Sequence, residues 1–125
     1  MTPEGKVVAR IKEVVRMAHG EVRKCQWVGH VGAPDLFIML PAGIHVWVEV
    51  KAPGEKPKPH QTREHIKMEE AGCIVYVTDS AATLAQILLD ELMCRCIPYK
   101  KQYIVDALIE ARRIMLQREA KDARA

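Results

Sequence analysis

The chain opens with apolar residues at helical spacing. Thr2 and Pro3 supply an N-cap and a proline at the first helical position. They are followed by a stripe of apolar residues three or four positions apart: Val7, Val8, Ile11, Val14, Val15 and Ala18. This pattern predicts a helix that ends near His19 and Gly20.

The pattern then changes to short runs typical of strands. Residues 23–30 have a β-like pattern, and the apolar run 36–40 follows after residues 32–34, Gly-Ala-Pro. Pro-Ala-Gly at 41–43 interrupts that run. Residues 44–51 alternate strictly, with apolar residues at the even positions and polar or aromatic residues at the odd ones. The sequence therefore predicts a hairpin.

The second half of the chain has mostly helical patterns. A loop rich in proline and lysine covers residues 52–59, after which the predicted elements are a helix at 61–71 closed by Gly72, a buried strand at 73–78, a helix at 81–92, a break at Pro98 and a helix at 103–119. We expect the extreme C-terminus to fray. The order of elements predicts an α/β fold in which helices pack on a mixed sheet.

Length and composition limit the class of protein. The chain has 125 residues, of which 49% are apolar, and this is enough for one core. No apolar run approaches the roughly 20 residues of a membrane span, and the start has no signal-peptide pattern, so we expect a soluble, intracellular protein. Cys25, Cys73, Cys94 and Cys96 fit a reducing compartment, and the last two have no matching pair to complete a zinc site. The mild excess of basic residues, 19 against 16 acidic, is weak evidence for a nucleic-acid partner.

The predicted hairpin brings two carboxylates together. A three-residue loop that pairs Leu40 with Ile44 also places Asp35 opposite Glu49, with Cβ atoms about 5 Å apart. Lys51, two residues after Glu49, projects from the same face. One loop residue more or fewer would break this opposition, and a bulge at Gly43 could shift the pairing by one position.

Two carboxylates this close repel each other unless a cation lies between them. Oxygen ligands favour Mg²⁺ or Mn²⁺. Such an ion polarises a phosphoryl oxygen and activates water, and Lys51 would orient that water or neutralise charge on the phosphate. Glu-x-Lys alone is commonplace in an alternating strand. Pro34-Asp35 at the matching offset is what favours the catalytic interpretation.

Pro34-Asp35 with Glu49-Val50-Lys51 resembles the PD-(D/E)xK nuclease motif, and the surrounding sequence resembles the VRR-NUC branch of that superfamily. The matching features include the Gly-Ala-Pro-Asp-Leu run, the Glu-Val-Lys-Ala-Pro run and Gln61 at the start of a helix. The resemblance extends over about residues 4–92. It implies a restriction-endonuclease-like core at 1–95, with a mixed central sheet flanked by helices, and a C-terminal helical extension of the same domain at 96–125.

The resemblance also implies a set of site residues. Asp35, Glu49 and the main-chain carbonyl of Val50 would bind Mg²⁺ or Mn²⁺, and Gln61 would hydrogen-bond the attacking water or a phosphate oxygen. The family places a further glutamate on the first helix. The candidates for this place near the metal are Glu4 and Glu13. Glu4 is favoured because it lies on the apolar stripe of that helix, whereas Glu13 lies about 200° around from Ile11. An acid at position 4 could also simply complement the helix dipole.

Other polar residues are more ambiguous. Lys24 is expected beside the hairpin, where it could contact a DNA backbone or remain solvated. His60 and His65 are expected on the surface.

Small stand-alone members of this family resemble phage and prophage nucleases that act on branched DNA, including four-way (Holliday) junctions. The resemblance implies a metal-dependent endodeoxyribonuclease in the cytoplasm of a bacterial host. A symmetric junction needs two active sites, which predicts a homodimer, and the C-terminal helix is the expected interface. The alternatives are a nuclease for flap, nicked or duplex DNA and a catalytically silent DNA-binding module, which would be expected to carry a broken motif.

Overall fold

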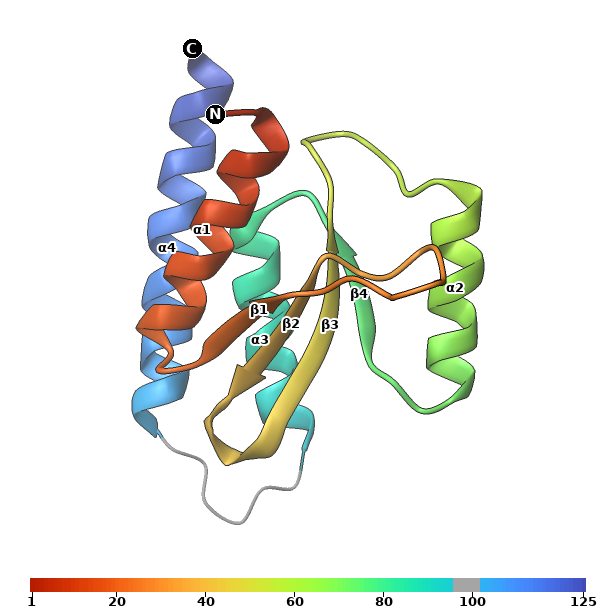
Figure 1. Cartoon of the computed structure of the whole chain (residues 1–125). Coiled ribbons are helices and arrows are strands. Elements are labelled where there is room, and N and C mark those ends of the chain that lie inside the picture. Colours follow the sequence, from red (N-terminus) through yellow and green to blue (C-terminus); the bar gives the residue numbers. More distant parts are fainter. Residues whose placement is uncertain (96–101) are drawn as a thin grey trace.

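The computed structural model describes residues 1–95 and 102–125, which form a sheet with helices on both sides (Figure 1). The elements follow the predicted order: α1 (Pro3–Met17), β1 (Glu21–Lys24), β2 (Leu36–Leu40), a 3₁₀ turn (Pro41–Gly43), β3 (Ile44–Val50), α2 (Pro59–Glu70), β4 (Val75–Thr78), α3 (Ala81–Cys94) and α4 (Gln102–Arg124). The predicted break at Pro98, the thiol of Cys96 and the boundary at residue 96 lie outside the described residues.

The four strands form one mixed sheet in the order β1-β2-β3-β4. The β1–β2 and β2–β3 pairs are antiparallel, and β4 runs parallel to β3. A parallel neighbour requires a crossover connection, and α2 provides it. The predicted fold class is confirmed: the chain is an α/β protein with a mixed sheet flanked by helices.

The hairpin has the register predicted from the alternation. Leu40 pairs with Ile44, and the pairing continues without a bulge to Leu36 opposite Val48. The turn is closed by two residues with positive φ, Ala42 at 73° and Gly43 at 77°. Glycine adopts such angles at little cost, whereas alanine rarely does. Asp35 therefore lies directly before β2, beside the end of β3.

The two faces of the sheet have different coverings. The even-numbered residues of β2 and β3 are buried against α1, α3 and α4 in one apolar core. Figure 1 shows α2 on the other side of the sheet from α1 and α4. The odd-numbered residues of β3, including Glu49, project toward that second side, so the candidate site lies away from the main core.

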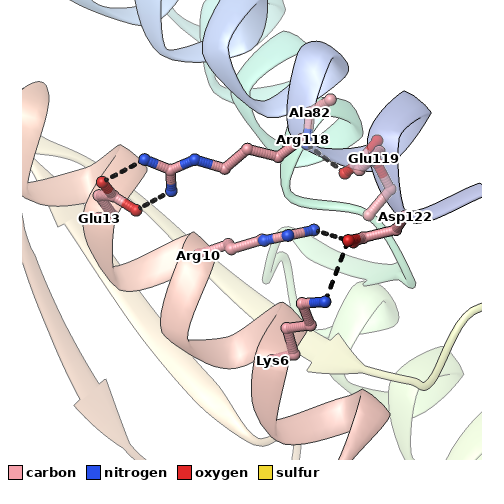
Figure 2. A network of polar contacts seen from close by, with 8 residues as sticks. Lys6, Arg10, Glu13, Ala82, Arg118, Glu119 and Asp122 are labelled. Carbon is pink, nitrogen blue, oxygen red and sulfur yellow. Dashed lines mark hydrogen bonds and ion pairs between the residues drawn. The ribbon is translucent and has the colours of Figure 1, made fainter. Parts of the chain in front are cut away.

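The C-terminal helix packs along α1 and α3. Its buried stripe consists of Ile104, Leu108, Ala111 and Met115. Near its end, Asp122 forms ion pairs with Lys6 and Arg10 of α1, at 3.1 and 2.7 Å (Figure 2). The prediction of a frayed C-terminus was wrong, because the helix continues to Arg124 and lies against α1 at Asp122.

Two strands differ from the sequence prediction. The first was expected at 23–30 but covers Glu21–Lys24, because residues 25–35 leave the sheet as a loop with positive φ at Gly29 and Gly32. The β4 strand was expected to be buried, but Val77 is exposed, Val75 and Tyr76 are half-buried, and Thr78 alone of its four residues is buried. This follows from the limited cover that α2 alone gives to its side of the sheet. Among the described residues, no helix combines the length and apolar character needed to cross a membrane.

Candidate active site

Asp35 is fixed to β3 by a main-chain contact. Its Oδ2 accepts a hydrogen bond of 2.8 Å from the amide of Val50. Its own carbonyl accepts a 2.8 Å bond from the amide of Cys25, which closes the base of the 25–35 loop. The aspartate is thus held between the start of β2 and the end of β3.

Glu49 is the most deeply buried acid of the site, at 1% exposure. Its Oε2 accepts a 2.9 Å hydrogen bond from Gln61 Nε2 and lies 3.2 Å from Lys51 Nζ. Its Oε1 is also buried, and it has no hydrogen-bond partner among the residues that the structure describes. An unsatisfied buried carboxylate oxygen is costly, so this atom is poised for a ligand from outside the chain.

Lys51 and Gln61 form the second half of the cluster. Lys51 follows β3 directly, is buried, and donates a 2.8 Å hydrogen bond from Nζ to Gln61 Oε1. The same Oε1 accepts the main-chain amide of Lys58 at 2.9 Å, which caps α2. Gln61 therefore ties the start of α2 to both Lys51 and Glu49.

The electrostatics of the site are dominated by the two acids. Burial, and after it the charge of Asp35, raise the pKa of Glu49 from 4.5 to about 7, although Lys51 acts in the opposite direction. Without a cation, the charge of Asp35 thus disfavours the ionised form of Glu49.

These residues fit a divalent metal ion. Asp35 and Glu49 offer carboxylate oxygens, one of them buried without a partner, beside the main chain of Val50. Over residues 1–95 and 102–125, no three His, Cys, Asp or Glu side chains are grouped to hold a metal. A site with only two acids suits Mg²⁺ or Mn²⁺, which take few protein ligands and keep water or phosphate in the other positions.

The structure places the remaining predicted residues elsewhere. Glu4 is exposed in the first turn of α1, and it does not form a three-acid group with Asp35 and Glu49. Glu13 pairs with Arg118 of α4, which directs it away from the sheet's second side (Figure 2). Lys24 is exposed at the end of β1, opposite Leu36 in the pairing register.

His65 was expected on the surface, and that prediction was wrong. It is 4% exposed, and its Nε2 has no partner in the described part of the chain. Burial lowers its pKa, which favours the neutral ring. The signal in the sequence was its spacing of four residues from Gln61, which puts both on one face of α2. His60 is exposed, as predicted.

Comparison with known proteins agrees with this geometry. No model of a known protein family matches the chain. A solved "VRR_NUC domain" superimposes with a TM-score of 0.66 and 39% identity, over 70% of this chain and 96% of that one. The chain belongs to the VRR-NUC family. The chain is also similar to "Putative nuclease p44" of Acyrthosiphon pisum secondary endosymbiont phage 1, 40% identical over 77 residues, or 62% of this chain and 83% of p44.

The chain covers nearly all of the solved domain, while more than a third of its own length lies outside the p44 match. The sheet, the hairpin and the crossover helix are the parts of the fold that build the site.

Proposed function

We propose that this VRR-NUC protein is an endodeoxyribonuclease that depends on Mg²⁺ or Mn²⁺ and cuts branched DNA, four-way junctions in particular. The observation that carries the proposal is the buried, unpartnered Oε1 of Glu49 beside Asp35 and Lys51. A cation there would satisfy this oxygen and relieve the repulsion between the two acids. A silent DNA-binding module would need none of these features.

Asp35, Glu49 and the carbonyl of Val50 would hold the metal ion, which when bound polarises a phosphoryl oxygen and lowers the pKa of a coordinated water. Lys51 directs two of its three N–H bonds at Gln61 Oε1 and Glu49 Oε2. The third can donate to the attacking water or to a phosphate oxygen. Gln61 fixes Lys51 in that position, so its role in this arrangement is to orient the lysine.

A branched substrate is supported by the relatedness to a phage protein and by a surface suited to a dimer. Ile109 and Leu116, seven residues apart on α4, are 53% and 43% exposed, while the opposite stripe of the helix is buried in the chain. Apolar residues at this spacing form helix–helix seams. A second copy packed there by two-fold symmetry would supply the second active site that a symmetric junction requires. The likeness to a phage protein supports a location in the cytoplasm of a bacterial host.

The substrate is tested by cleavage of labelled four-way junction, flap, nicked and linear duplex DNA of matched sequence with Mg²⁺ or Mn²⁺. We expect the four-way junction to be cut fastest, with paired incisions across the junction. Faster cutting of flap, nicked or linear duplex DNA would show that this DNA, and not the junction, is the preferred substrate. The proposed nuclease activity would still hold.

The dimer is tested by light scattering on purified protein. We expect a dimer that becomes a monomer in Ile109→Asp/Leu116→Asp and loses paired incision. Ile66→Asp, at an exposed position on α2, is the matched control and should remain a dimer. A monomeric parent protein, or a double variant that stays dimeric, would exclude this face.

A further inference from the structure

The loop at residues 25–35 is docked on α2 by one carboxylate. Glu64 accepts a 2.7 Å hydrogen bond from Trp27 Nε1 at Oε2, and its Oε1 lies 3.0 Å from His30 Nε2. The glutamate side chain is only 12% exposed. The hydrogen bonds from His30 and Trp27 lower the pKa of Glu64, so it is ionised at neutral pH and both rings act as donors.

The loop also meets α2 at van der Waals distance. Gly32 has a φ of 94°, and a Cβ built on it would lie 2.8 Å from Glu64 Cβ and 3.1 Å from the carbonyl of His60. Only glycine allows this approach. The ring of Trp27 packs edge-on against Trp47 of β3, with centroids 5.4 Å apart. The Trp27–Glu64 bond therefore lies in a packed setting between loop, helix and sheet.

Both ends of this contact lead to the active site. The loop ends in Asp35, whose Oδ2 accepts the amide of Val50. Three residues before Glu64, on the same side of α2, Gln61 bonds to Glu49 and Lys51. Asp35 and Gln61 come from separate segments, and Glu64 joins those segments directly.

We propose that Glu64 is a positioning residue: by binding Trp27 and His30 it locks the 25–35 loop to α2, so that Asp35 is held in register with Glu49, Lys51 and Gln61. The role in catalysis rests on the proposed nuclease function, whereas the positioning of Asp35 is a property of the protein alone. Partners that orient ligands in this way typically change metal affinity or activity by about 10- to 100-fold when removed.

The positioning is tested by amide hydrogen exchange in Glu64→Ala, with Glu70→Ala on the exposed side of α2 as the matched control. The amide of Val50 reports on Asp35, and the amide of Trp47, which donates to the carbonyl of Ile74 just before β4, reports on the sheet. The quantity compared is the ratio of the exchange rate at Val50 to that at Trp47. We expect this ratio to be at least about tenfold higher in Glu64→Ala than in Glu70→Ala, in line with one lost hydrogen bond. Equal ratios in the two variants would overturn the proposal.

The catalytic consequence is measured on the same variants with the best DNA substrate. We expect kcat to fall by about 10- to 100-fold in Glu64→Ala with KM little changed, and to be partly restored in Glu64→Gln, which keeps an acceptor for Trp27. Trp27→Phe, which keeps an aromatic ring but lacks the N–H donor, should resemble Glu64→Ala. If the parent protein cuts no DNA, the nuclease proposal fails, and the Val50 exchange ratio still decides whether Glu64 positions Asp35. An unchanged kcat in Glu64→Ala would contradict the catalytic part alone.

Discussion

Asp35 and Val50 are joined by a 2.8 Å hydrogen bond from the main-chain amide to the carboxylate Oδ2. The bond ties the last residue of a loop to the strand that carries Glu49. Asp35 thus has two separable roles. Its carboxylate accepts the hydrogen bond that closes the end of the hairpin, and its charge raises the pKa of Glu49.

Replacement of Asp35 should separate these two properties. Asp35→Asn keeps an acceptor for Val50 but removes the charge, so we expect a stability close to that of the parent protein and a loss of Mn²⁺ binding of at least about tenfold. Asp35→Ala should lose Mn²⁺ binding and also about 1 kcal/mol of stability. Calorimetric titration with Mn²⁺ and urea unfolding measure the two effects. Undiminished Mn²⁺ binding in Asp35→Asn would remove Asp35 from the metal site.

Gln61→Ala should impair Lys51 without removing it. The substitution deletes the acceptor of Lys51 Nζ and the donor to Glu49, so we expect kcat to fall by about 10- to 100-fold. The cap on the amide of Lys58 is lost as well, which should cost about 1 kcal/mol in urea unfolding. Gln86→Ala on α3 is the control and should cut DNA at the parent rate. An unchanged kcat in Gln61→Ala would show that Lys51 needs no such support.

The stability of the metal-free protein should depend on Glu49. Its pKa is about 7 in the folded protein against an ordinary value of 4.5, so the folded state binds the proton more tightly than the unfolded state. This contribution is fully present below about pH 4.5 and is lost as the pH rises through about 7, by on the order of 3 kcal/mol. The free energy of unfolding is measured by urea in EDTA, from about pH 5 to 8, for the parent protein and for Glu49→Gln. It should fall with rising pH more steeply in the parent protein than in Glu49→Gln, because only the parent protein loses this contribution. Parallel curves would show that Glu49 does not titrate in this range.

The C-terminal helix should draw its stability from its apolar stripe more than from its ion pairs. Leu108 is fully buried between helices, and Leu108→Ala should cost about 2–5 kcal/mol. Asp122 is partly exposed, and Asp122→Ala should cost no more than about 1 kcal/mol despite its two cationic partners. Urea unfolding measures both variants. A larger loss in Asp122→Ala would mean that the ion pairs hold α4 in place.

The sequence could predict the parts of the site that depend on local pattern. Strict alternation on β3 and a three-residue turn determine which residues face each other, because a slip of one residue would turn Glu49 to the opposite face. For this reason the amino-acid sequence alone predicts that Leu40 pairs with Ile44 and that Glu49 and Lys51 share a face. The resemblance to a known family then supplied Gln61.

The parts that the sequence could not predict depend on contacts between distant segments. His65 is buried although the composition of its helix is polar, because burial depends on what packs over α2. The hydrogen bond between Trp27 and Glu64 spans 37 residues, and the ion pair between Lys6 and Asp122 spans 116. The periodicity of apolar residues does not predict such contacts. The short first strand and the ordered C-terminus therefore could not be predicted from the sequence.

The most direct test of the central claim is the rate of four-way junction cleavage as Mg²⁺ or Mn²⁺ is titrated, for the parent protein and Lys51→Ala, with EDTA as the blank. Lys67→Ala, on the exposed part of α2, serves as a matched charge control. We expect cutting that requires the metal, a loss of about 100-fold or more in Lys51→Ala, and near-parental rates in Lys67→Ala. Cutting in EDTA, parental rates in Lys51→Ala, or a folded protein that binds the junction without cutting it would contradict the proposed metal-dependent nuclease.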